Sequence, residues 1–240
     1  MRQEPERLAV LLDGGFVKRK LLALNAGRER PESPPARAPL EDVYPTAQDV
    51  VELVGRIRRE PRLDGCRLLR AYFYDGPPIS GRRPNPLGGK PYLFDGPYRA
   101  LNQRLHDSLR VTADFAVRQG DTVFRGWRLR EESLRDLSRS PRFLAPEDLA
   151  PSVEQKGVDL RIGLDVALLS LKHLVDTIVL VTGDSDLIPA MKLARREGLW
   201  VYLDTMGHEV RSELVEHADY VFSSSVEPRK SPPPPRTSSG

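Results

Sequence analysis

The 240-residue sequence has a single cysteine and no long apolar run. One cysteine, Cys66, excludes both a disulfide framework within the chain and a cysteine-based zinc cluster. A membrane-spanning helix needs about 18 consecutive apolar residues, and no such stretch is present. The first apolar run, LAVLL, is too short for the core of a signal peptide. We therefore expect a cytoplasmic protein without a membrane partner.

An excess of charge of one sign is also lacking, because 37 Lys and Arg stand against 34 Asp and Glu, for a net charge of +3. The charges are nevertheless unevenly distributed. Residues 76–150 contain 13 Lys/Arg and 9 Asp/Glu, a surplus of four, whereas residues 151–222 contain 7 and 12, a deficit of five. Solvated surface charge explains many such counts, but a basic rim around an acidic centre would also suit a polyanionic partner.

What is present is a regular alternation of apolar runs and helical patterns. Near-continuous apolar runs, typical of strands covered on both faces, cover 8–13, 67–75, 177–184 and 199–204. Helical patterns cover 16–25, 46–59, 97–109, 158–175, 187–196 and 209–217. Strands that alternate with helices pair in parallel through right-handed crossovers. The sequence thus predicts an α/β fold, a Rossmann-like three-layer sandwich with a mainly parallel central sheet.

Three segments lie outside this alternation. Residues 27–45 are rich in proline and charge and are predicted to form a loop excursion. Residues 76–150 are predicted to be a basic insertion, with a β-hairpin made of 111–117 and 122–130 that turns at Gly120 and Asp121. The Pro/Ser-rich tail, 223–240, is expected to be disordered. We therefore predict a single domain over residues 1–222.

Acidic residues mark the ends of the predicted strands. Because ligands bind beyond the carboxyl ends of parallel strands, the four aspartates there are candidates for one site: Asp13, Asp75, Asp184 and Asp204. A single aspartate at such a position is more often a helix cap. The helix predicted from residue 158 adds Asp159 in its first turn and Asp165 inside an apolar stretch, where a carboxylate needs a partner.

Three of these stretches carry a family resemblance: LLDGGF near the start, KGVDLRIGLDVALL in the middle and VLVTGDSDLIPAMKLARREGLWVYLD toward the end. Together they resemble the NYN domain, a member of the PIN-like nuclease superfamily, in its LabA-like branch. The resemblance covers 1–26, 46–75 and 151–222 and leaves 76–150 unexplained. Gly15 and Phe16 follow the first acid where many members have a small residue and an asparagine.

The resemblance implies a PIN-like ribonuclease that binds Mg²⁺ or Mn²⁺ and hydrolyses RNA phosphodiester bonds. Asp13, Asp165 and Asp184 match the family's catalytic and metal-binding acids, and Asp159 and Asp186 match further catalytic positions. Oxygen ligands of this kind suit Mg²⁺, which keeps several of its waters. Such an ion activates a water for attack and stabilises the departing oxygen.

Substrate contacts are expected from hydroxyl groups and cations near these acids. Thr182 and Ser185 are placed to orient waters, although turn hydrogen bonds are an equal use for them. Four basic residues are candidates for RNA phosphates, with a solvated surface as the alternative: Lys18, Lys156, Arg128 and Arg130. Arg128 and Arg130 are two apart on a predicted strand and so share one face. The expected partner is single-stranded RNA, and a homo-oligomer is a further option.

Two other function classes compete with the ribonuclease. The GDS sequence also begins the nucleophile motif of GDS-type esterases, which would need Ser185 with a base such as His208. However, Asp186 replaces the leucine of that motif, and an aspartyl phosphatase would need a second acid two residues after Asp13. The stronger alternative is a non-catalytic regulatory module that binds RNA or protein on the same fold.

Overall fold

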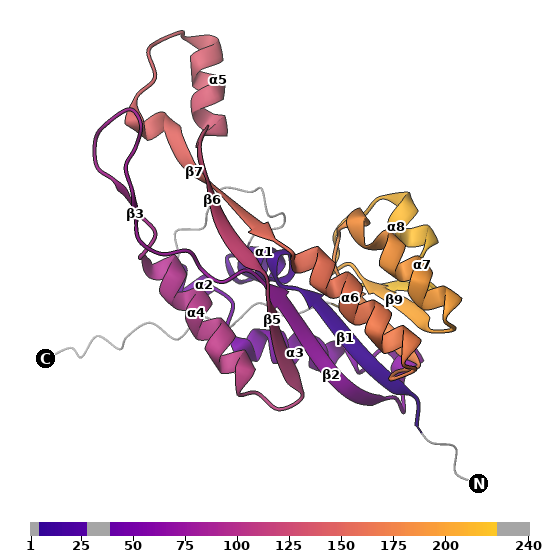
Figure 1. The fold of residues 1–240 in the computed structure, drawn as a ribbon. Helices are drawn as coiled ribbons and strands as arrows, with labels where there is room; N and C mark the ends of the chain where they lie inside the picture. Colours follow the sequence, from indigo (N-terminus) through magenta and orange to yellow (C-terminus); the bar gives the residue numbers. More distant parts are fainter. Residues whose placement is uncertain (1–4, 28–38, 225–240) are drawn as a thin grey trace, which may run out of the picture.

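A six-stranded parallel sheet forms the centre of the computed structural model, which describes residues 5–27 and 39–224. The strand order is β10-β9-β8-β1-β2-β5 (Figure 1). The strands are β1 (Arg7–Asp13), β2 (Arg67–Asp75), β5 (Phe115–Gln119), β8 (Thr177–Val181), β9 (Trp200–Asp204) and β10 (Tyr220–Phe222). All five pairings between neighbouring strands are parallel, as predicted from the alternation of strands and helices.

Helices cover both faces of this sheet (Figure 1). One face is covered by α1 (Gly14–Asn25), α3 (Ala47–Ile57) and α4 (Pro97–Arg110), and the other by α6 (Val158–Leu171) and α7 (Ile188–Arg196). Along β1, Leu8, Val10 and Leu12 point into the first layer, whereas Ala9 and Leu11 point into the second. Both faces of β1 are therefore buried, and the predicted three-layer sandwich is confirmed.

Shorter elements complete the described chain. They are α2 (Leu40–Val43), η1 (Pro61–Leu63), β3 (Arg82–Arg83), β4 (Tyr92–Leu93), β6 (Asp121–Leu129), α5 (Glu131–Arg139), η2 (Pro146–Asp148), β7 (Leu149–Lys156), η3 (Ser185–Leu187) and α8 (Ser212–Glu216). The strand predicted over 177–184 ends at Val181, because the chain turns at Gly183 into η3. The helix predicted to reach residue 175 ends at Leu171, and β10 was not predicted.

The predicted β-hairpin is wrong. β5 pairs in parallel with β2 at the edge of the central sheet, whereas β6 pairs antiparallel with β7. Gly120 separates β5 from β6, and a Cβ atom there would lie 2.4 Å from the carbonyl oxygen of Lys156, so no larger residue fits. The chain thus leaves the central sheet at Gly120 instead of turning back on itself. Both α4 and β5, which lie within the predicted insertion 76–150, belong to the three-layer core.

We call residues 121–156, from β6 through α5 to β7, the arm. The arm projects from the carboxyl edge of the sheet, with α5 at its far end (Figure 1). Much of the loop predicted over 27–45 and of the tail predicted over 223–240 falls on residues 28–38 and 225–240, outside the described residues. Within the described ranges, no helix is long and apolar enough to cross a membrane.

Candidate active site

Asp13 stands at the carboxyl end of β1, where the chain enters α1. Its side chain caps that helix, since one carboxylate oxygen accepts a hydrogen bond of 3.1 Å from the backbone N–H of Phe16. Gly14 allows this sharp entry, because a Cβ atom there would lie 2.5 Å from the carbonyl oxygen of Tyr74 on the neighbouring strand. The Phe16 ring is buried in the core. The DGGF sequence therefore aims one carboxylate at the sheet edge.

Thr182 joins Asp13 to the acids that follow β8. Its buried hydroxyl donates a hydrogen bond of 3.1 Å to the second carboxylate oxygen of Asp13 and accepts one of 3.1 Å from the backbone N–H of Asp184. Asp184 in turn caps η3, because its carboxylate accepts a bond of 2.9 Å from the N–H of Asp186. Thr182 thus fixes the two acid-bearing turns relative to each other.

Four aspartates act on one another at this edge, and we call them the acidic site: Asp13, Asp159, Asp184 and Asp186. Burial raises the pKa of Asp13, and repulsion by Asp184 adds to the rise, although bonds from Phe16 and Thr182 and the charge of Arg19 oppose it. The pKa of Asp159 is also raised, by shielding from water and then by the charges of its three acidic neighbours. Their mutual repulsion would be relieved by a bound cation.

Asp165 does not join the acidic site. It lies six residues after Asp159 on α6, which corresponds to about 9 Å along the helix axis and about 240° around it. There its carboxylate accepts a hydrogen bond of 2.8 Å from the hydroxyl of Tyr74 and pairs with Arg118 at 3.2 Å. Within the described ranges, no three Asp, Glu, His or Cys side chains are grouped to hold a metal ion. The described structure therefore does not group Asp13, Asp165 and Asp184, and their assignment as metal-binding residues stays a prediction.

The remaining acids still match the way in which proteins bind Mg²⁺. This ion is usually bound through one or two carboxylates together with substrate phosphates, and it keeps several waters. Asp13 and Asp184 supply two carboxylates linked through Thr182, and burial raises the pKa of Asp13. Their oxygens suit Mg²⁺ or Mn²⁺ better than a softer metal. The donor set thus fits a hard divalent cation that is completed by water and a phosphate.

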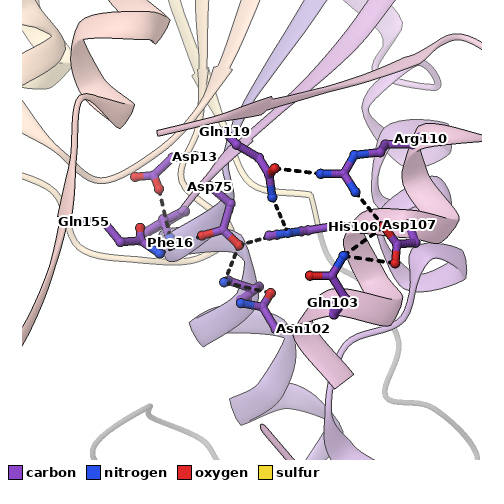
Figure 2. A network of polar contacts seen from close by, with 11 residues as sticks. Asp13, Phe16, Asp75, Asn102, Gln103, His106, Asp107, Arg110, Gln119 and Gln155 are labelled. Atoms are coloured by element: carbon purple, nitrogen blue, oxygen red, sulfur yellow. Dashed lines mark hydrogen bonds and ion pairs between the residues drawn. The ribbon is translucent and has the colours of Figure 1, made fainter. Parts of the chain in front are cut away.

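A second cluster of charges is buried beside the acidic site, around Asp75 at the end of β2 (Figure 2). Lys18 on α1 donates a hydrogen bond to Asp75, and both side chains are buried. His106 on α4 bonds the same carboxylate oxygen at 2.7 Å, and the amide of Gln155 donates to the other at 2.8 Å. His106 and Lys18 lower the pKa of Asp75 despite its burial. Lys18, predicted to contact a phosphate, is instead the partner of a buried carboxylate.

Further polar side chains extend this network toward the surface (Figure 2). The amide of Gln119 donates to Nδ1 of His106 at 2.9 Å and accepts from Arg110 at 2.6 Å. Arg110 also pairs with Asp107, at the exposed end of α4. Sequence reasoning placed Asp75 at a strand end but missed His106, Gln119 and Gln155 as its neighbours. Only the position of Asp75 signalled this network, because the other members of the network come from four different elements: α1, α4, β5 and β7.

The other predicted substrate contacts are spread over the arm and the β8–α7 turn. Arg128 lines a large groove between the arm and the core, whereas Arg130 donates a bond of 3.0 Å to the carbonyl oxygen of Glu147 within the arm. The two side chains therefore have different surroundings. Lys156 is exposed at the last residue of β7, immediately before α6. Ser185 begins η3, between Asp184 and Asp186.

Comparison with known proteins gives one family match, to the NYN domain, over residues 97–225. The match includes residues 97–150, which the resemblance had left unexplained. The assignment of this chain to the LabA-like branch of the family stays a prediction. No curated protein has a matching sequence. One similar solved structure is a protein of unknown function from Vibrio parahaemolyticus, 16% identical, with a TM-score of 0.48 over 93% of this chain and 96% of that one. Because the family match spans more than half of the sequence, from α4 through β10, the chain belongs to the NYN domain family.

Proposed function

We propose that this protein is a ribonuclease that uses Mg²⁺ or Mn²⁺ to hydrolyse phosphodiester bonds in single-stranded RNA. NYN domains belong to the PIN-like nuclease superfamily, whose members generally use divalent metal ions. The observation that carries the proposal is the convergence of four aspartates from β1, α6 and the turn after β8 at the carboxyl edge of the sheet. That edge is where open parallel sheets bind their ligands.

The side chains of the acidic site divide into two roles in this proposal. Asp13 and Asp184 hold the cation, and Thr182 keeps their two turns in register. The cation, when bound, would supply activation of water and neutralisation of charge on the phosphate. Asp159 and Asp186 are exposed, and Asp159 is influenced by the charges of the other three acids, so we assign both to hold water at the site. The raised pKa of Asp159 suits it to accept a proton from an attacking water.

The test is incubation of the purified full chain with end-labelled single-stranded RNA in Mn²⁺, Mg²⁺ or EDTA. We expect cleavage with either metal and none with EDTA. Asp184→Asn keeps the oxygen that caps η3 but removes the charge, so cleavage should fall by about 100-fold or more, since even outer-shell partners of metal sites contribute about 10- to 100-fold. Asp165→Asn is the matched control, because Asp165 lies outside the acidic site.

The assay also separates the proposal from its main competitor. A non-catalytic module that binds RNA or protein would leave the RNA intact in all three conditions, whether or not the chain binds it. If Asp165→Asn and Asp184→Asn reduced cleavage equally while both proteins stayed folded, the assignment of the reaction to the acidic site would be wrong.

A further inference from the structure

A hollow lies between the arm and the core, next to the turn that carries Asp13. Its volume is about 970 Å³, near the upper end of the range of about 300–1,000 Å³ that is typical of ligand sites. Its walls come from α1, α2, the start of α4, the segment before and including β4, and the arm. The lining residues that matter here are Arg19, Tyr44, Tyr92, Tyr98, Thr122 and Arg128. We call this hollow the aromatic groove.

Aromatic rings stand on two of its walls. On the core side, the rings of Tyr44 and Tyr98 meet edge to face at 5.3 Å, and 52% of Tyr98 is exposed. On the other side, Tyr92 and Phe94 meet at 4.9 Å, and 40% of Tyr92 is exposed. Rings exposed to this degree are available to a planar ligand, and bases of single-stranded nucleic acids stack on such side chains.

The second wall is braced from behind, so its rings are held in place. The ring centroids of Phe94 and Phe124 lie 6.0 Å apart, as do those of Phe124 and Trp127. These contacts tie the β3–β4 segment to the arm. The ring centroid of Tyr92 lies 6.3 Å from that of Trp127. The arm, which contributes nothing to the central sheet, therefore supports one wall of the groove.

Cations connect the groove to the acidic site. Arg19 lines the groove, donates a hydrogen bond of 3.2 Å to the carbonyl oxygen of Gly15 and lowers the pKa of Asp13 through its positive charge. Arg128 lines the groove from the arm. A strand lying in the groove would thus have basic side chains along it and the acidic site at its end. This arrangement complements an RNA backbone, whose phosphates interact with Lys and Arg.

The groove also contains a polar group in need of a partner. The hydroxyl of Thr122 is buried and has no hydrogen-bond partner among the described residues. A Cβ atom on Gly76 would lie 2.5 Å from that hydroxyl, so Gly76 packs directly against it. An unpaired buried hydroxyl is unfavourable.

We propose that the aromatic groove binds an unstacked stretch of single-stranded RNA, with bases against Tyr92 and Tyr98 and the backbone along Arg19 and Arg128. This inference rests on the proposed function for its choice of RNA and adds how that RNA is selected. A base inside a duplex is stacked between its neighbours and cannot also stack on these rings, so the groove selects unpaired RNA. The strand that leaves the groove past Arg19 reaches Asp13, where it would be cut.

Binding in EDTA tests the groove without relying on cleavage. The probe is an unstructured RNA of about 12 nucleotides, within the range of known single-strand sites, with one 2-aminopurine whose fluorescence reports stacking. We expect the wild-type chain to change this fluorescence. Tyr92→Ala with Tyr98→Ala should raise Kd by about tenfold or more and remove the change, whereas Tyr98→Phe should preserve both. Phe143→Ala is the matched control, because Phe143 is 96% exposed and does not line the groove.

Arg128→Gln provides a second variant that leaves the rings intact. It should weaken binding and reduce the slope of log Kd against log salt by about one. Unchanged Kd and fluorescence in the tyrosine pair, or equal affinity for duplex RNA of the same length, would overturn the groove proposal even if the chain cleaves RNA. Wild-type binding that depends on the tyrosines, without cleavage in Mn²⁺, would instead support the groove and overturn the ribonuclease.

Discussion

Nε2 of His106 lies 2.7 Å from a carboxylate oxygen of Asp75, and both side chains are completely buried. Because the amide of Gln119 donates to Nδ1 of His106, the imidazole carries its proton on Nε2 and donates it to Asp75. The ammonium group of Lys18 donates to the same carboxylate oxygen and supplies the positive charge that pairs with it. This network fixes α1 and α4 against the end of β2, directly beside the turn that presents Asp13.

Removal of Lys18 from this network should destabilise the fold strongly. Loss of one partner of a buried ion pair typically costs about 3–5 kcal/mol, because the other charge stays buried. We expect Lys18→Met to lower the free energy of unfolding by about 3 kcal/mol in denaturant titrations. Lys192→Met, at an exposed position of α7, is the control and should change it by less than about 0.5 kcal/mol. Equal stability of the two variants would mean that the Lys18 contact is dispensable.

The lowered pKa of Asp75 predicts a specific loss of stability in acid. A carboxyl whose pKa is lower in the folded state stabilises the fold above its unfolded pKa of about 3.9, and this contribution is lost as the pH falls through the folded value. Asp75→Asn should therefore be less stable than the wild type at pH 7, and the difference should shrink below about pH 4. Thermal unfolding at a series of pH values measures this difference in stability. Asp64→Asn, at an exposed position, is the control and should follow the wild-type profile.

Asp13 should show the opposite sign, because its pKa is raised in the fold. A raised pKa favours the protonated form, so the ionised carboxylate destabilises the fold at neutral pH, and stability is gained as the pH falls through the folded pKa. Asparagine caps helices about as well as aspartate. Asp13→Asn should therefore raise the melting temperature at pH 7 while it removes cleavage. A clearly lower melting temperature would assign Asp13 a structural role.

Metal binding should stabilise the folded chain through the same acids. A ligand that binds only the folded state at about 100 times its Kd adds about 2.7 kcal/mol to the free energy of unfolding. We expect Mn²⁺ to raise the melting temperature of the wild type and of Asp165→Asn. Asp13→Asn combined with Asp184→Asn should show no such rise. A rise of the same size in the double variant would place the metal elsewhere on the chain.

Local pattern was enough to predict the layers of the fold and the edge at which the site lies. The runs ending near Asp13, Asp75 and Asp204 are apolar because both faces of those strands are covered, and this property can be read within about eight residues. This property predicts that the DGGF turn and the GDSD turn lie at the same edge of the sheet.

Which residues and segments far apart in the sequence contact one another was decided only by the tertiary structure. The segment 115–119 could pair with either a near neighbour or a distant strand, and burial against β2 decided it. Likewise, the periodicity of α6 places Asp159 and Asp165 on one helix, but packing turns Asp165 toward Tyr74 and Arg118. Lys18 is buried because its ammonium group bonds to Asp75 of β2 and Asn102 of α4. Such pairings depend on long-range approach in three dimensions, which a local pattern of apolar and charged residues does not encode.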